Sequence, residues 1–392
     1  MAVGTSKGVV MSPRTARIRP GLRGVALAVA SLTLAGSSAA AALAAPAARQ
    51  AGPASLVPLS KVGLGWSIAE YSAASVATGH NAFKGKTTLY AVSPQGRKYA
   101  FYSWPASFAG PSSYYLTDWS GDGQRVLVQN FYNRFEQISL ATGKVVSRFT
   151  LPASVPVIGY TRPDGENVLT LGPNGMGVRR YNLQGQLQKV LSGSGFSAIE
   201  SPDGTSIIVE ASYGLEQVSN VGGVIKRLRP PLAVSGCYPE RWWNATTILA
   251  ACYAARGPAE SRLWLFPVNG GQVTALTAQR NGTGEDQGDI DAWKLISGVY
   301  LQSLGPCGVE FIGTQSRNGS VHQVNVPGVH YASDHIVTGQ GSSLVVEADN
   351  GCAAGASLVL FNPGTRKVTW VFRAPAKVIG TESAVPFGRP LS

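Results

Sequence analysis

Short runs of alternating apolar and polar residues recur along most of the chain, and they come in pairs around glycine-bearing turns. The clearest pair is LYAVSPQGRKYAFYSW, which turns at Gly96. Alternation with a period of two predicts half-buried strands, and a short glycine-containing break between two strands predicts a hairpin. Gly364 lies 268 residues after Gly96, and the six steps between them average about 45 residues. The intervening hairpins turn at Gly143, Gly185, Gly222, Gly270 and Gly319.

A second hairpin precedes most of these, as in IGYTRPDGENVLTL and SAIESPDGTSIIVE. In a Pro-Asp-Gly turn, Pro presets φ, Asp hydrogen-bonds the nearby backbone, and Gly accepts the positive φ that closes the turn. We therefore interpret Asp164 and Asp203 as turn formers, not as catalytic acids. Each repeating unit supplies four short strands.

Four-stranded units that repeat every 40 to 50 residues are typical of blades around a central channel. The sequence predicts an all-β protein, a β-propeller of about seven four-stranded blades, with six and eight as the alternatives. The first unit, GWSIAEYSAASVATG, has a poorly defined first hairpin. The tail VIGTESAVPFG is the candidate for the extra strand that closes the ring.

Two of these repeats, SPDGTSIIVE at 201–210 and LWLFPVNGGQVTALT at 263–277, resemble the WD-like repeats of TolB-like propellers. The resemblance spans roughly residues 60–390 and implies the fold. It does not fix an activity, because the same repeat occurs in binding propellers and beside hydrolase domains. TolB also carries an α/β domain ahead of its propeller, where this chain has only a short stretch.

The first 46 residues have the three-part layout of a secretory signal peptide. Five bases and no acid come before an apolar stretch from Val25 to Leu43, and small residues then surround Pro46. The alternative is a transmembrane anchor, but the stretch is rich in Ala, Ser and Gly. We expect a signal peptide at 1–46, a short linker at 47–61 and a β-propeller domain at 62–392. The exported protein then has no stable membrane span and is secreted or associated with the cell envelope.

The chain carries a formal net charge of +12. Five of its 33 Lys and Arg residues lie before Ala45, so the remainder carries +7. Its short basic clusters, such as Arg179-Arg180, have no interleaved aromatic residues, and we expect no nucleic-acid partner. Attraction to anionic cell-wall polymers stays open. Arg outnumbers Lys and Ala is abundant, which is typical of a high-GC genome such as an actinobacterial one.

Four cysteines, Cys237, Cys252, Cys307 and Cys352, lie in the exported part, and an even number in an oxidising compartment favours disulfides. Cys237 and Cys252 are placed symmetrically about a turn at Asn244, so they face one another across a hairpin. Cys307 and Cys352 are one repeat apart. We predict the pairs Cys237–Cys252 and Cys307–Cys352, with a four-thiolate zinc site as the alternative.

An acidic stretch is the candidate ligand face. Glu285, Asp286, Asp289 and Asp291 are expected in a connection between blades, on the same face of the ring as the cysteines. Clustered carboxylates there could bind a cation or a basic ligand. The alternative is a solvated loop, since the spacing is not that of a regular calcium loop.

Signals for catalysis are weak. The only G-x-S-x-G motif, at residues 4–8, lies in the predicted signal peptide. His80, His322, His330 and His335 have no metal-binding pair spacing, and no cofactor motif occurs. The sequence therefore favours a non-catalytic propeller that binds a protein or a cell-wall component. The alternative is a propeller enzyme, a lyase or glycan hydrolase, with its active site at the channel mouth.

Overall fold

The computed structural model describes residues 57–75, 85–106, 114–130, 133–152, 155–255, 260–279, 287–305, 308–329, 333–349, 356–374 and 378–387. All described residues belong to the second of the chain's two units, Arg49–Ser392. The predicted signal peptide at 1–46 therefore lies outside the described residues.

The second unit is built from antiparallel sheets in which consecutive strands pair with one another. Five sheets have four strands. The first has the order β28 (Val378–Pro386), β1 (Ser67–Ser75), β2 (Lys86–Val92), β3 (Lys98–Pro105). The second contains β4 (Tyr114–Trp119), β5 (Arg125–Asn130), β6 (Arg134–Ser139) and β7 (Val145–Thr150). The third contains β8 (Val157–Tyr160), β9 (Asn167–Leu171), β10 (Val178–Asn182) and β11 (Leu187–Ser192).

The fourth sheet contains β12 (Ala198–Glu200), β13 (Ser206–Ala211), β14 (Gly214–Ser219) and β15 (Val224–Leu228). The last contains β24 (Ser333–Gln340), β25 (Ser343–Asp349), β26 (Ser357–Asn362) and β27 (Lys367–Phe372). The 3₁₀ helices η1 (Leu59–Lys61) and η2 (Pro173–Gly175) accompany the strands in the described part of the chain.

One larger sheet has eight strands. Its first half is β16 (Val234–Asn244), β17 (Thr247–Ala254), β18 (Ser261–Pro267) and β19 (Thr274–Ala275). Its second half is β20 (Gly288–Leu295), β21 (Gly298–Leu304), β22 (Glu310–Gln315) and β23 (Val321–Gln323). One parallel pairing, Ser261 with Gly288, joins the two halves.

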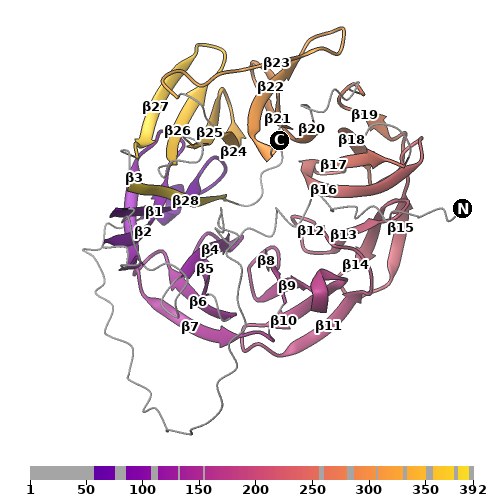
Figure 1. Ribbon diagram of the computed structural model, residues 1–392. Coiled ribbons are helices and arrows are strands. Elements are labelled where there is room, and N and C mark those ends of the chain that lie inside the picture. Colours follow the sequence, from indigo (N-terminus) through magenta and orange to yellow (C-terminus); the bar gives the residue numbers. More distant parts are fainter. Residues whose placement is uncertain are drawn as a thin grey trace, which may run out of the picture. The chain divides into compact units, whose positions relative to one another are not determined.

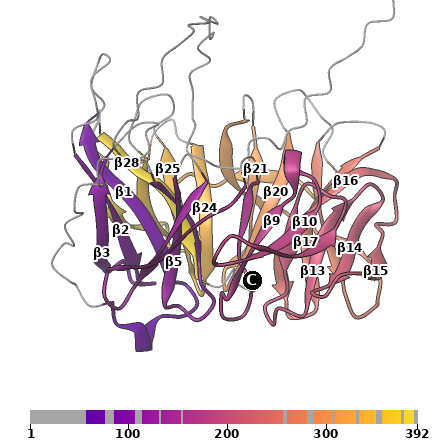
Figure 2. The ribbon, with the colours of Figure 1, turned by 90° about the horizontal axis from the view of Figure 1, so that it is seen from below.

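The sheets stand side by side around a common centre, as the blades of a propeller do (Figure 1). Their strands run between the two faces of the ring (Figure 2). Neighbouring inner strands are in contact, since β4 touches both β28 and β8, and β24 touches both β20 and β28. The sequence prediction of an all-β propeller with four-stranded antiparallel blades is confirmed.

The chain's last described strand closes the ring. β28 pairs with β1, from Ser67 opposite Pro386 to Ser75 opposite Val378. It becomes the innermost strand of the first sheet, although more than 300 residues separate the two partners. The closing strand predicted from the tail is therefore confirmed.

The Pro-Asp-Gly turn at Asp203 shows why this sequence makes a tight corner. One carboxylate oxygen of Asp203 accepts hydrogen bonds from the Ser201 hydroxyl at 2.6 Å and from the Thr205 N–H at 3.1 Å. Gly204 has φ +70°, and a Cβ there would lie 2.0 Å from the carbonyl oxygen of Arg162 in the preceding sheet. Asp203 is thus a turn former, and Gly204 permits close contact between sheets.

Apolar side chains fill the space between adjacent sheets. Leu89, Trp104 and Trp119 belong to one buried cluster of the first and second sheets. Ile208, Trp242 and Phe266 belong to another, where the fourth sheet meets the eight-stranded one. A single sheet could not bury both of its faces, so each depends on its neighbours. Trp104, Trp119 and Trp242 are therefore packing residues.

Cys237 and Cys252 form a disulfide with an S–S distance of 2.03 Å. They sit directly opposite one another in β16 and β17, as the sequence predicts. Cys307 and Cys352 lie outside the described residues, so their pairing stays a prediction.

Candidate functional site

The inner strands of neighbouring sheets are connected by side chains. The Asp118 carboxylate accepts a hydrogen bond from the N–H of Tyr160 at 2.7 Å, and Glu70 accepts one from the N–H of Leu116 at 2.8 Å. The register shifts beside Leu116 and again within β8. Such bulges leave main-chain groups without a ladder partner. The neighbouring sheet supplies the missing acceptor.

Arg162 extends this network across three sheets. Its guanidinium lies 3.4 Å from the Asp118 carboxylate and donates to the Trp119 carbonyl at 2.9 Å. Its main-chain N–H donates to Glu200 at 2.6 Å. Both side chains of the Arg162–Asp118 pair are buried, at 7% and 4% exposure. These charges therefore connect the second, third and fourth sheets.

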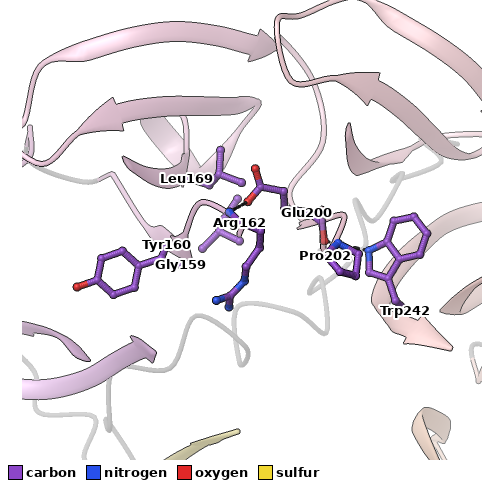
Figure 3. Close-up of a pocket in the computed structure, with 8 residues that line it drawn as sticks. Gly159, Tyr160, Arg162, Leu169, Glu200, Pro202 and Trp242 are labelled. Carbon is purple, nitrogen blue, oxygen red and sulfur yellow. Dashed lines mark hydrogen bonds between the residues drawn. The ribbon is translucent and has the colours of Figure 1, made fainter. Parts of the chain in front are cut away.

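A pocket opens beside this network, between the third and fourth sheets (Figure 3). Its space, including the part open to solvent, is about 340 Å³. Arg162, Glu200 and Trp242 are the polar side chains that define it, and Tyr160, Leu169 and Pro202 complete most of its wall. The Trp242 indole N–H donates to the Glu200 carbonyl at 2.9 Å. Glu200 is the only carboxylate among its described lining residues, so the pocket does not offer the two neighbouring acids that acid–base hydrolysis of a glycoside requires.

Two residues of the predicted acidic ligand face lie elsewhere than expected. Asp289 and Asp291 are in strand β20, not in a connecting loop, and both are buried. Asp291 receives two hydrogen bonds from the guanidinium of Arg241. Asp289 accepts one from the Ser303 hydroxyl at 2.7 Å. Glu285 and Asp286 lie outside the described residues.

The physical reason is that buried apolar residues lie between and directly after these acids. Ile290 separates them, Ala292 and Trp293 follow, and all three are buried, so the segment from Gly288 to Leu295 forms a strand that pairs with β21. Arg241 also lies over the Trp293 ring, 3.1 Å from its centroid. Arg241 and Asp291 therefore form an internal ion pair between the two halves of the eight-stranded sheet.

Two carboxyls interact where the ring closes: Glu70 is fully buried, and Glu382 lies at an exposed position of β28. Burial strongly raises the pKa of Glu70, and the nearby Glu382 carboxyl raises it further. Desolvation by the surrounding protein also raises the pKa of Glu382, which accepts a hydrogen bond from the Thr87 hydroxyl. Neither carboxyl lines the pocket of Figure 3. In the last sheet, burial raises the pKa of Asp334 to about 7.

A histidine–carboxylate pair lies at the start of the inner strand of the last sheet. His335 Nδ1 is 2.6 Å from a carboxylate oxygen of Glu310, and His335 is partly exposed. The Glu310 N–H donates to the Ser333 hydroxyl at 2.9 Å. A carboxylate that orients a histidine is one element of general-base catalysis. His80 and His330 lie outside the described residues, and His322 is an exposed residue of β23.

A larger groove lies at the opposite end of the strands from this pair. The volume of this groove, including the part open to solvent, is about 970 Å³. Its wall comes from the segment before β1, the β2–β3 turn and the β24–β25 turn, and it includes Lys61, Leu64, Trp66, Arg97, Tyr99 and Gln340. We call it the basic groove. Sequence reasoning missed it because Lys61, Arg97 and Gln340 come from three distant parts of the chain.

Among the described residues, no group of three or more His, Cys, Asp and Glu side chains is arranged to hold a metal ion. A search of the same residues for a helix with the length and hydropathy to cross a bilayer found none.

Comparison with solved structures gives the class of fold. A protein from Bacteroides uniformis assigned as a 6-phosphogluconolactonase is 15% identical, with a TM-score of 0.50, and the match covers 82% of this chain and 98% of that one. A TolB from Agrobacterium tumefaciens is 12% identical over 83% of this chain and 98% of its own, with a TM-score of 0.41. WD40 propellers are also among the matches. At these identities the likeness shows the β-propeller fold alone.

A puromycin-hydrolysing peptidase from Mycobacterium tuberculosis is 16% identical over 77% of this chain and 52% of its own, with a TM-score of 0.48. The chain spans about half the length of the two peptidase structures it matches. No protein-family model matches the sequence, and no curated protein matches it.

Proposed function

We propose that this chain is an exported, non-catalytic seven-bladed propeller that binds a protein or a cell-wall component. The observation that supports binding most directly is the contrast between its interior and its basic groove. The interior holds two buried ion pairs, Asp118 with Arg162 between the second and third sheets and Arg241 with Asp291 between the halves of the eight-stranded sheet. Lys61 and Arg97 are exposed in the basic groove. The interior charges stabilise the ring, and the groove charges face solvent.

Seven blades follow if the eight-stranded sheet is counted as two. Its halves, β16–β19 and β20–β23, are each a four-strand meander, and they share one parallel pairing. The other five sheets each have four strands. The count agrees with the 45-residue repeat of the sequence.

Export is supported by the cysteine chemistry and by the N-terminal sequence. Disulfides such as Cys237–Cys252 persist in oxidising compartments. In this proposal residues 1–46 are removed as a signal peptide and residues 47–61 link the new N-terminus to the domain. The protein then remains secreted or associated with the envelope.

The second candidate function is a propeller lyase or glycan hydrolase. The Glu310–His335 pair supports it, because a partly exposed histidine held by a carboxylate can accept a proton. The buried carboxyl Glu70 and the neighbouring carboxyl Glu382, both with raised pKa values, would be the acid candidates.

The test is a crosslinking pull-down. The full chain is produced in an exporting host, the secreted form is sequenced at its N-terminus, and that form is used as bait on native envelope and culture fractions. The proposal expects cleavage near Ala45 to Ala47 and a reproducible protein or wall-polymer partner. Retention of residues 1–46 would contradict export. Turnover of envelope glycans that is lost in His335→Ala would contradict the non-catalytic function.

A further inference from the structure

The basic groove has two exposed cations on rigid supports. Lys61 ends the 3₁₀ turn η1, where its N–H donates to the Pro58 carbonyl at 2.8 Å. Arg97 ends the β2–β3 turn, where its carbonyl accepts from the Ser93 N–H at 2.9 Å. The Ser93 hydroxyl accepts from the N–H groups of Gln95 and Arg97. The backbone is thus fixed before a ligand arrives, which reduces the entropy cost of binding.

These cations form no ion pair with any described acid. By contrast, the bases Arg162 and Arg241 in the interior are each held by an aspartate. An anionic ligand in the groove would therefore meet two positive charges without displacing an internal partner. Complementary charge also accelerates association and selects the partner.

The rest of the groove is apolar and amide-bearing. Leu64 is 52% exposed, although it is a large apolar side chain. The partly buried Tyr99 ring stacks on Trp66 at a centroid distance of 5.8 Å. Gln95 and Gln340 are exposed amides, each able to donate and accept hydrogen bonds. Such a surface suits a ligand that combines carboxylates, amide groups and an apolar side chain.

Gly65 sets the position of one of these amides. It has φ +81°, and a Cβ built on it would lie 1.8 Å from Oε1 of Gln340 and 3.1 Å from Pro94. The positive φ favours glycine here, and the absence of a Cβ leaves room for the Gln340 amide to lie over this segment. The groove is therefore assembled across the junction of the first and last sheets.

Resting on the proposed binding function, we propose that the basic groove binds an extended acidic peptide segment that carries a large apolar side chain. Lys61 and Arg97 would bind its carboxylates, Gln95 and Gln340 its main-chain amides, and Leu64 with Tyr99 its apolar residue. A phosphate or sulfate polymer fits less well, because it would be favoured by a row of cations and would leave the apolar and amide groups unused.

The experiment measures binding of the mature propeller to two synthetic polypeptides, poly-glutamate and a glutamate–tyrosine copolymer, and to polyphosphate. The inference predicts a Kd for the copolymer at least about fivefold lower than for poly-glutamate or polyphosphate at matched ionic strength. Lys61→Glu with Arg97→Glu should raise the copolymer Kd at least about tenfold. Leu64→Ser should remove the preference for the copolymer over poly-glutamate.

Lys144→Glu is the matched control. Lys144 is exposed and follows Gly143 in the β6–β7 turn, the equivalent position of the next sheet to Arg97 after Gly96. It changes the charge by as much as Lys61→Glu or Arg97→Glu alone, but outside the groove, and the copolymer Kd should change less than about twofold, whereas each single groove variant should raise it more. Equal weakening by Lys144→Glu, polyphosphate binding as tight as copolymer binding, or no copolymer binding would each overturn the inference.

Failure here is distinguishable from failure of the proposed function. A partner that is captured equally by wild-type protein and the Lys61→Glu, Arg97→Glu variant would overturn the groove assignment and leave the binding function intact. Turnover that depends on His335 would instead contradict the function itself.

Discussion

Asp118 and Tyr160 are joined across a sheet boundary, where the carboxylate of the first accepts a 2.7 Å hydrogen bond from the main-chain N–H of the second. The same carboxylate lies beside the guanidinium of Arg162. The buried Asp118 carboxylate thus accepts the hydrogen bond of a main-chain N–H at a β-bulge and also balances the charge of an arginine. Because Tyr160 and Arg162 follow Asp118 by more than 40 residues, this contact fixes how two sheets stand relative to each other.

Removing that acid should destabilise the propeller. Asp118→Ala leaves Arg162 buried without its carboxylate and should lower the free energy of unfolding by about 3 to 5 kcal/mol, as measured by urea titration. Asp118→Asn retains an oxygen acceptor for the Tyr160 N–H and loses only the charge, so its loss should be smaller. Stability equal to the wild type in both variants would contradict a structural role.

The Arg241–Asp291 pair allows a sharper version of this test. Asp291→Ala should cost about 3 to 5 kcal/mol, because the Arg241 charge would stay buried without compensation. The double variant Arg241→Met, Asp291→Leu removes both charges and should be more stable than Asp291→Ala. If the double variant unfolds at a lower urea concentration than Asp291→Ala, the unpaired Arg241 charge is not the cause of the lost stability.

The Cys237–Cys252 disulfide should contribute measurably to stability. The cysteines are 15 residues apart in sequence, and closing a loop of that length contributes about 3 kcal/mol in the chain-entropy account. Replacing both by Ala should lower the urea midpoint accordingly. Peptide mapping without reduction should recover Cys237 with Cys252 and Cys307 with Cys352. Recovery of Cys252 linked to Cys307 would contradict the predicted pairing.

Asp334 should make stability depend on pH. Its folded pKa of about 7 lies above the value near 4 of an unfolded aspartate, so the folded state favours the protonated form. This contribution to stability is fully present below about pH 4 and is lost as the pH rises through 7. The loss is on the order of 4 kcal/mol at most, from the size of the shift.

Asp334→Asn isolates that effect. The variant should show a flatter dependence of the unfolding free energy between pH 4 and 7 than the wild type, and it should be the more stable of the two at pH 8. Asp203→Asn is the control, since the hydroxyl of Ser201 lowers the Asp203 pKa and its contribution is lost on acidification instead. Parallel curves for Asp334→Asn and wild type would contradict the assignment.

The closing strand should be indispensable. Ending the chain at Ala374 removes β28 and exposes the inner edge of β1, including the fully buried Ile68 and Ala69. We expect loss of the cooperative thermal transition in circular dichroism. Ending the chain at Phe387 keeps β28 and should leave the midpoint unchanged. A cooperative transition at the wild-type temperature in the shorter chain would show that ring closure does not need β28.

Much of the architecture could be predicted because turns and strands produce recognisable patterns in short stretches of sequence. Gly96 and Gly143 mark turns with positive φ, and the tail strand has the alternation of the strands before it. The Cys237–Cys252 pair could be predicted because a hairpin places symmetric positions opposite each other. Each of these signals depends on residues close together in sequence.

Contacts between sheets, or between the halves of the eight-stranded sheet, could not be predicted in this way. Arg241 and Asp291 are 50 residues apart, and no local pattern indicates that they meet. Asp289 and Asp291 were expected in a loop because they continue an acidic run, although Ile290 between them already alternates as in a strand. Lys61 was assigned to a linker and Arg97 to a turn, and only the ring brings them into one groove.

Intact-mass analysis of the captured partner, after incubation with wild-type protein and with His335→Ala, tests the proposed non-catalytic binding function most directly. A binding propeller leaves its partner chemically unchanged, so we predict the same mass and the same stoichiometric recovery with both proteins. A change in the partner's mass that occurs with the wild type and disappears with His335→Ala would contradict the non-catalytic function.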